Sequence, residues 1–232
     1  MGSIRTSDRV KEGTMERFQD RRDAGRRLAQ LLLPYANRTD VMILALPRGG
    51  VPVAYEVALA LNAPLDILIV RKLGLPGREE LALGAVASGG IRVLNNDIIR
   101  VLNVPDEVIN IVARQELQEL ERREHAYRGD RSTPEIENRT VILVDDGLAT
   151  GASMRAAVAA VRAQHPARIV IAVPTAAREV CDAFQFRVDE IVCAMTPEPF
   201  DGVGKWYAEF KQISDEEVRV LLEEANRQLL HG

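Results

Sequence analysis

The stretch VILVDDGLATGAS, residues Val141 to Ser153, carries the strongest indication of the fold. Four aliphatic residues run directly into two aspartates, and a loop of small, hydroxyl-bearing and glycine residues follows. A continuous apolar run of this kind is typical of a strand buried on both faces of a parallel sheet. The apolar spacing after Gly151 then predicts a helix over 152–164. The stretch therefore predicts a buried strand, a polar loop and a helix in succession.

The same succession recurs along the chain. Apolar runs at 41–46, 65–72, 168–174 and 189–195 predict further strands, and helical patterns separate most of them. Strands that alternate with helices through short connections predict an α/β fold with a doubly wound, mainly parallel sheet. Ligands bind such sheets at the carboxyl ends of the strands, which is where the polar loops of this sequence fall.

The remaining segments are assigned by their spacing and their breakers. Gly89-Gly90 predicts a hairpin turn between two short apolar segments. The segment from Leu73 to Leu83 carries two glycines, a proline and adjacent acids, Glu79 and Glu80, so we expect an exposed loop with solvated charges. Helices are predicted at 14–35, 51–62, 105–128, 177–184 and 215–230.

Composition excludes several classes of protein. A chain of 232 residues with 47% hydrophobic content is long enough for one α/β domain with additions. The net charge of −4 gives no global signal for nucleic acid, and no apolar run approaches the ~20 residues of a membrane span. We therefore expect a cytoplasmic protein, for which a homo-oligomer is compatible with the sequence. Cys181 and Cys193 match no metal-binding spacing and are expected to be buried free thiols.

The loop after the opening strand combines two kinds of chemistry. Thr150, Gly151, Ala152 and Ser153 lie at a helix start, where free N–H groups and hydroxyls make a cradle for an anion. Asp145-Asp146 cannot bind phosphate, but carboxylates bind sugar hydroxyls or a divalent cation. A phosphorylated ribose offers both groups. The alternative is a solvated acidic turn followed by an ordinary helix cap.

At this point the sequence resembles a known family. VILVDDGLATGAS closely resembles the ribose-5-phosphate loop of the type I phosphoribosyltransferases, in which hydrophobic residues precede two acids, two variable positions, Ala/Thr, Thr/Ser and Gly. The resemblance implies that the catalytic acids Asp145 and Asp146 bind the ribose hydroxyls of 5-phosphoribosyl pyrophosphate (PRPP). Ala149 to Ser153 would hold its 5′-phosphate.

The segment ALPRGGVPVA, residues 45–54, is similar to the pyrophosphate loop of that family. The resemblance assigns Arg48, Gly49 and Gly50 to pyrophosphate and predicts a cis peptide bond between Pro47 and Arg48. A non-proline cis bond costs about 3 kcal/mol, so it persists only where a site requires it.

Residues 70–90 are similar to the flexible loop that closes over the site in these enzymes. Arg71 and Lys72 are neighbours on a strand, so their side chains point to opposite faces. One of the two is expected to reach pyrophosphate, and Lys72 is favoured because it lies nearer the loop. The alternative for both is a solvated basic pair.

The family builds a small hood over the acceptor from the ends of the chain. MTPEPFDGVGKWYAEF, residues 195–210, concentrates aromatic residues, so Phe200, Trp206 and Tyr207 are candidates to bind the acceptor. Equally, these rings could anchor the C-terminal helix. The domains expected are an N-terminal helical segment at 1–39, a PRPP-binding core at 40–195 and a C-terminal hood segment with a helix at 196–232.

The resemblance implies a Mg²⁺-dependent transferase that moves the 5-phosphoribosyl group of PRPP to a nitrogenous acceptor and releases pyrophosphate. The combination LPRGG, VRKLG, DDGLATGAS and VGKWY is most similar to a bacterial group known as predicted phosphoribosyltransferases. The alternative is a regulatory protein that senses PRPP or a nucleotide on the same fold. A dinucleotide-binding domain is disfavoured, because no GxGxxG occurs.

Overall fold

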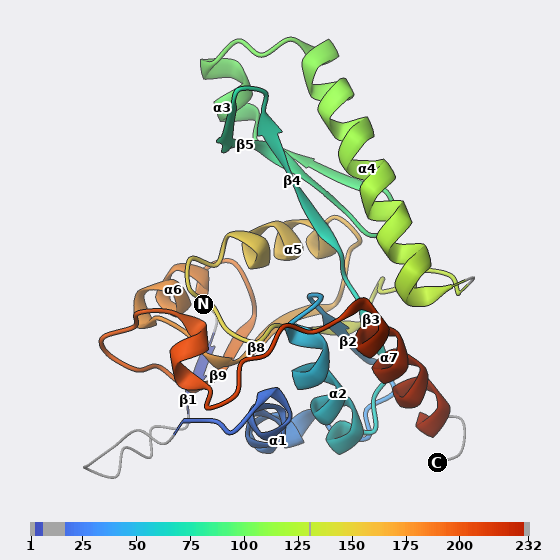
Figure 1. Cartoon of the computed structure of the whole chain (residues 1–232), viewed down its shortest axis with the longest axis vertical. Helices are drawn as coiled ribbons and strands as arrows, with labels where there is room; N and C mark the ends of the chain where they lie inside the picture. The colour runs from blue at the N-terminus through green and yellow to red at the C-terminus, as the bar shows by residue number, and fades with distance from the viewer. Residues whose placement is uncertain (1–2, 7–16, 130, 230–232) are drawn as a thin grey trace.

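The computed structural model describes residues 3–6, 17–129 and 131–229 (Figure 1). Its centre is a six-stranded sheet in the order β1-β9-β8-β7-β2-β3, and every neighbouring pair in it is parallel. The predicted α/β fold with a mainly parallel sheet is therefore confirmed. The strands of this sheet are β1 (Ser3–Thr6), β2 (Val41–Ala45), β3 (Leu65–Ile67), β7 (Thr140–Val144), β8 (Arg168–Thr175) and β9 (Glu190–Met195).

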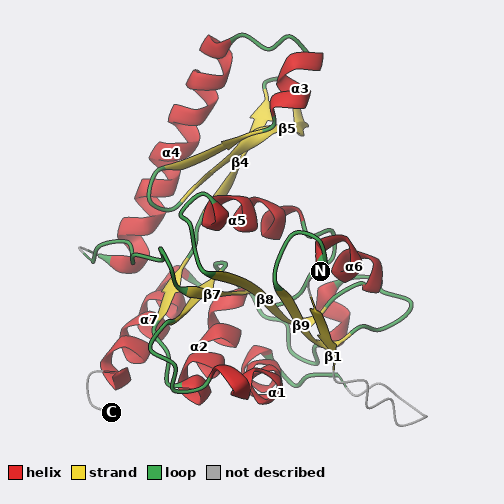
Figure 2. Ribbon diagram, turned by 180° about the vertical axis from the view of Figure 1, so that it is seen from behind, coloured by secondary structure: helices red, strands yellow, loops and turns green. Residues whose placement is uncertain are grey.

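Helices cover both faces of the sheet (Figure 2). Along β7, Val141 and Leu143 pack into the cluster that holds α5 and α6, whereas Ile142 and Val144 pack into the cluster that holds α1, α2 and α7. This burial on both faces explains the continuous apolar run in the sequence. The covering helices are α1 (Arg21–Leu32), α2 (Gly50–Leu61), α5 (Ala152–Arg162), α6 (Arg178–Phe184) and α7 (Asp215–Leu229).

The first predicted helix is shorter than expected. Residues 14–16 of that prediction lie outside the described residues, and the helix itself begins at Arg21 after its N-cap, Asp20. At its end, Leu33–Tyr35 form the 3₁₀ turn η1, because Pro34 cannot continue an α-helix.

A lobe stands off one end of the sheet, above α5 (Figures 1 and 2). It holds a three-stranded antiparallel sheet and two helices. Its elements are β4 (Val70–Leu75), β5 (Arg78–Ala87), β6 (Ile91–Leu94), α3 (Asn96–Val101) and α4 (Asp106–Arg128).

Two expectations for this region are wrong. The exposed loop expected from Leu73 to Leu83 is a hairpin, in which β4 and β5 pair around a turn at Pro76 and Gly77. The strand expected at 65–72 is divided into β3 of the central sheet and β4 of the lobe. Gly74 permits this hairpin, because a methyl group at its Cβ position would lie 2.9 Å from the Glu79 carbonyl oxygen. The predicted turn at Gly89-Gly90 is confirmed, and both residues have a positive φ.

A buried arginine ties the lobe to the core. Arg128, at the end of α4, pairs with Asp66 of β3 at 2.8 Å and donates to the Ile67 carbonyl oxygen at 2.7 Å. It also pairs with Glu124 one turn back along α4. The contacts with Asp66 and Ile67 lie where the chain leaves β3, so they hold the base of the lobe against the core.

A segment before α1 and a segment after β9 pair with each other beside the sheet. The Phe18 amide donates to the Trp206 carbonyl at 2.9 Å, and the Ala208 amide donates to the Phe18 carbonyl at 2.8 Å. The 3₁₀ turn η2 (Val203–Trp206) leads into this pairing. Residues before α1 and residues after β9 thereby form one unit beside the sheet.

The sequence also led to expectations about membrane-spanning segments and about the two cysteines. None of the helices among the described residues is both long and apolar enough to cross a bilayer. Cys181 and Cys193 are buried thiols, as predicted.

Candidate functional site

The strand order reverses between β2 and β7, and the candidate site lies there. From β2 the chain adds β3 on one side, and it later adds β7 on the other. The register pairs Ala45 with Val144, so both strands end at the same edge of the sheet. Such a switch point is where doubly wound sheets bind ligands. The loops that follow are the two that the sequence singled out.

These two loops touch directly. A methyl group at the Cβ position of Gly49 would lie 2.1 Å from Asp146 Oδ2, and one on Gly50 would lie 2.7 Å from the Val144 carbonyl oxygen. Any side chain at either position would push the loops apart. The two glycines are thus explained by packing of one loop against the other.

The loop after β2 has the backbone that the sequence predicted. The peptide bond between Pro47 and Arg48 is cis. The Gly50 amide donates to the Leu46 carbonyl at 3.1 Å and begins α2, so this amide is engaged within the loop.

Asp145 lies half-buried beside this loop. Its Oδ1 accepts a hydrogen bond from the Asp146 amide at 2.8 Å. Burial, together with the charge of Asp146, raises the pKa of Asp145 well above its ordinary value. An acid held in this way gains from any partner that carries donors or positive charge.

Asp146 already has such a partner. Its Oδ2 accepts from Arg21 Nε at 2.9 Å, and the two side chains are 16% and 9% exposed. Burial raises the pKa of Asp146, while Arg21 opposes the shift. The Asp146 carbonyl also accepts from the Tyr207 hydroxyl at 2.6 Å, and burial raises the pKa of Tyr207, which keeps it protonated as a donor.

Arg21 is the residue of this site that the sequence did not single out. Its Nη1 donates to the Lys211 carbonyl at 2.7 Å, and its guanidinium lies 3.8 Å from the centroid of the Phe210 ring. The only signal was a basic run in RFQDRRDAGRRLAQ, which does not distinguish one arginine from its neighbours. Only the long-range contact with Asp146 distinguishes Arg21 from the neighbouring arginines.

The loop from Ala149 to Ser153 leads into α5 as predicted. Gly151 is the N-cap with φ +68°, and a methyl group there would lie 2.8 Å from the Phe184 ring. Thr150 and Ser153 are exposed, as are Ala149 and Ala152. An 11-residue helix therefore presents its N-terminal turn and two hydroxyls to solvent at the same sheet edge.

Arg71 and Lys72 lie on β4 of the lobe, not at the edge of the central sheet. Arg71 pairs with Glu116 of α4 at 2.6 Å. Lys72 is exposed, and strand alternation puts its side chain on the face opposite Arg71. Arg71 is thus held by the lobe, whereas Lys72 is open to solvent.

The aromatic residues of 195–210 divide into two roles. Tyr207 is buried, packs against Phe18 with ring centroids 5.5 Å apart, and serves as the anchor described above. Phe200 and Trp206 are partly exposed. Val203 reaches the loop after β7, where a methyl group on Gly147 would lie 2.7 Å from Val203 Cγ1. This segment therefore covers the loop that carries the two acids.

A metal ion at this site would need oxygen atoms of the bound ligand in addition to those of the protein. Within the described ranges, no three His, Cys, Asp or Glu side chains come together as a metal cluster. Mg²⁺ commonly binds through one or two carboxylates plus phosphate oxygens and water. Asp145 fits the single-carboxylate part of such a set.

Comparisons with known proteins agree with this geometry. Residues 14–191 match the family model described as phosphoribosyl transferase domain. The chain is 45% identical over 213 residues to the Mycobacterium tuberculosis protein named "Putative phosphoribosyl transferase Rv0571c", with 92% of this chain covered. The chain spans about half (48%) of the length of that relative. The crystal structure of TT1426 from Thermus thermophilus is similar, with a TM-score of 0.81, 42% identity, and coverage of 90% of this chain and 98% of that one.

Proposed function

Since the chain belongs to the phosphoribosyl transferase domain family, we propose that it transfers the 5-phosphoribosyl group of PRPP to a nitrogenous acceptor and releases pyrophosphate. The observation that carries this proposal is the contact between Gly49 and Asp146. This contact brings the loop after β2, which carries Arg48, against the loop after β7, which carries the two acids and leads into the N-terminus of α5. A sugar that carries phosphates at both ends needs these groups together.

Each end of PRPP has a proposed partner. The N-terminal turn of α5, with the hydroxyls of Thr150 and Ser153, takes the 5′-phosphate. Asp145 accepts hydrogen bonds from the ribose hydroxyls, and Asp146 keeps its pair with Arg21 and holds the loop in place. Arg48 takes the pyrophosphate; of the two basic residues of β4, Lys72 is favoured over Arg71 to contribute there, because Arg71 is paired with Glu116.

The reaction breaks the bond between C1 of the ribose and the pyrophosphate oxygen, and the bonding electrons leave with pyrophosphate. A nitrogen lone pair of the acceptor forms the new bond to C1, and the acceptor proton passes to solvent. Positive charge develops at C1 in between, and the carboxylate of Asp145 stabilises it electrostatically. Mg²⁺ held by Asp145 and phosphate oxygens would neutralise charge on the leaving group.

The acceptor is proposed to lie under the segment 195–210. Val203 contacts the loop with the acids, and Trp206 and Phe200 of the same segment are partly exposed. The Trp206 Nε1 atom is buried without a hydrogen-bond partner among the described residues, so it offers a donor to a ligand. A planar nitrogen heterocycle with an acceptor atom fits both the ring and the donor.

The test is a screen of nucleobases and amines for PRPP-dependent pyrophosphate release in the presence of Mg²⁺. We expect at least one acceptor to support release and Asp145→Asn to abolish it. Calorimetry separates the alternatives: PRPP that binds without any release would favour a sensor on the same fold. Unchanged PRPP affinity in Asp145→Asn would overturn the assignment of the ribose site.

A further inference from the structure

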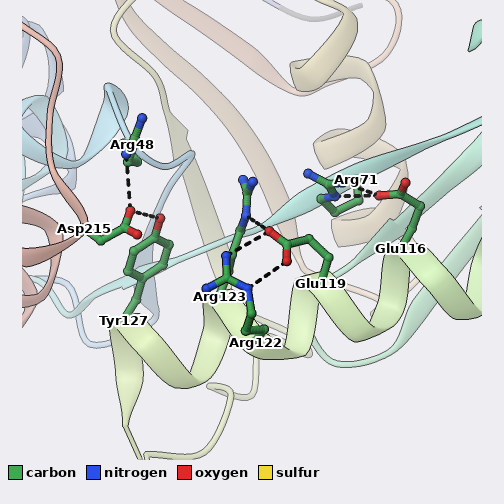
Figure 3. A network of polar contacts seen from close by, with 8 residues as sticks. All are labelled: Arg48, Arg71, Glu116, Glu119, Arg122, Arg123, Tyr127 and Asp215. Atoms are coloured by element: carbon green, nitrogen blue, oxygen red, sulfur yellow. Dashed lines mark hydrogen bonds and ion pairs between the residues drawn. The ribbon is translucent and has the colours of Figure 1, made fainter.

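A cluster of arginines lies between the lobe helix α4 and the core loop that follows β2 (Figure 3). One arginine belongs to the core loop, one to β4, and two to α4. Three acids from α4 and α7 lie among them. The arginine cluster and its acids are Arg48, Arg71, Arg122, Arg123, Glu116, Glu119 and Asp215.

Asp215 of α7 occupies the side of Arg48 that faces α4. Its Oδ1 lies 3.4 Å from Arg48 Nη1, and the same oxygen accepts from the Tyr127 hydroxyl at 2.7 Å. Tyr127 is buried in α4, whereas the Asp215 side chain is 54% exposed. A carboxylate oxygen therefore lies beside the guanidinium that we assign to pyrophosphate, on a side chain that is about half exposed to solvent.

Within the described part of the chain, the terminal nitrogens of Arg123 have no hydrogen-bond partner and point to the same side of α4 as Arg48. The Arg123 Nε donates to Glu119 at 2.7 Å, and Figure 3 shows the end of its guanidinium pointing away from α4, on the side where Arg48 and Arg71 lie. Burial and the contact with Asp215 raise the pKa of Tyr127 to about 12, and the nearby charges of Arg123 and Arg48 oppose this shift. Both arginines thus act on one phenol, which remains a hydrogen-bond donor.

We propose that Arg123 and Tyr127 of α4 complete the pyrophosphate site that Arg48 begins, and that Asp215 fills this site until a diphosphate displaces it. The proposal rests on the proposed function, because it takes Arg48 as a pyrophosphate ligand. When Asp215 leaves, the Tyr127 hydroxyl transfers its hydrogen bond to a phosphate oxygen. Arginine suits this exchange, since its planar fork binds carboxylate and phosphate in the same geometry.

The arrangement also predicts which anions bind. Arg48 lies on the core and Arg123 on the lobe, so we expect an anion with two phosphates to contact both more readily than an anion with one. A monophosphate would gain hydrogen bonds from only one of these two arginines, although it would still have to displace Asp215. We therefore expect the site to select diphosphates over monophosphates.

The experiment is calorimetric titration of the full chain with magnesium pyrophosphate, and separately with ribose 5-phosphate. Asp215→Asn should tighten pyrophosphate binding about three-fold or more, because it removes a competing charge. Arg123→Gln should weaken it about tenfold, the loss expected for one charge-assisted hydrogen bond. Ribose 5-phosphate affinity should stay unchanged in both variants.

Matched controls come from the same helices. Glu216→Gln removes an acid from the same first turn of α7, where Glu216 pairs with Arg219. Arg114→Gln removes an exposed arginine of α4. Neither should change pyrophosphate affinity. A gain in affinity for Asp215→Asn cannot come from partial unfolding, so this variant remains informative even if it is less stable.

The outcomes separate this inference from the proposed function. If Arg48→Gln weakens pyrophosphate binding but Asp215→Asn and Arg123→Gln behave as their controls do, the inference is wrong and the proposed function stands. If the wild-type chain binds neither pyrophosphate nor ribose 5-phosphate, both fall. Tighter binding in Asp215→Asn with weaker binding in Arg123→Gln supports the exchange.

Discussion

Replacement of Arg21 by methionine tests how much the buried ion pair between α1 and the acidic loop after β7 contributes to stability. The pair with Asp146 is largely buried, with side chains 9% and 16% exposed. Removing one partner of a buried pair costs about 3–5 kcal/mol, because the other charge is left unpaired. Since Asp146 keeps some exposure, we expect Arg21→Met to lower the free energy of unfolding by about 3 kcal/mol, at the lower end of that range. The lost hydrogen bond to the Lys211 carbonyl adds about 1 kcal/mol.

The assay is urea denaturation at neutral pH with a matched control. Arg22 is the next residue of α1, and its side chain is 47% exposed where it pairs with Glu56 at 3.3 Å. Arg22→Met should therefore change stability by no more than about 1 kcal/mol, as exposed pairs do. In Arg21→Met combined with Asp146→Asn the two effects should be far from additive, because the two side chains share one interaction.

The pH dependence gives an independent check. Without Arg21, the pKa of Asp146 in the folded state rises further, because burial is no longer opposed. As the pH falls through that raised pKa, Asp146 takes up a proton and the unpaired charge disappears, so the deficit should shrink. A cost below about 1 kcal/mol at neutral pH, or an additive double mutant, would refute the reasoning.

Three other predictions follow from single contacts. Burial raises the pKa of Asp145 above the unfolded value of about 3.9, so the ionised side chain lowers the stability of the folded protein above that pH. Asp145→Asn should therefore raise the urea midpoint at neutral pH. This gain should vanish near pH 4, below which Asp145 is protonated in both states. Gly151→Ala should cost more than Gly90→Ala in thermal melts, because both have a positive φ but only Gly151 meets an aromatic ring. Arg128→Met should lower the free energy of unfolding by about 3–5 kcal/mol, since it leaves Asp66 unpaired. It should also speed amide hydrogen exchange in the lobe, and an unchanged exchange rate there would contradict this prediction.

Most strands of the central sheet could be predicted because they carry their own signal, whereas β1 at Ser3–Thr6 was not predicted. The run from Val141 to Val144 is buried on both faces, so its residues are apolar without alternation, and the helix that follows has clear spacing. The cis bond before Arg48 was also predicted, from the family resemblance of the glycine loop. In these places local sequence and tertiary structure agree.

The lobe could be predicted only in part: helix α4 and the turn at Gly89-Gly90 were predicted, whereas the hairpin of β4 and β5 was not. Gly74, Pro76 and Gly77 are breakers in any local interpretation, yet in the structure they form and flank a tight turn of a hairpin. The break between β3 and β4 has no turn residues to mark it, because the change of sheet depends on which partners each segment meets. Contacts between distant residues decide both features, as they decide the place of Arg21.

The two adjacent acids therefore have different relations to the fold, although the sequence treats them as a pair. Asp146 is bound from both chain ends, by the side chain of Arg21 and by the Tyr207 hydroxyl at its carbonyl, so its charge is compensated before any ligand arrives. Among the described residues, Asp145 accepts a hydrogen bond from the backbone amide of its neighbour alone, and burial raises its pKa. A half-buried acid without an ion-pair partner among the described residues is unfavourable for folding and favourable for binding a partner rich in donors. Asp145 is thus the acid whose charge is best explained by a ligand, and Asp146 the one explained by structure.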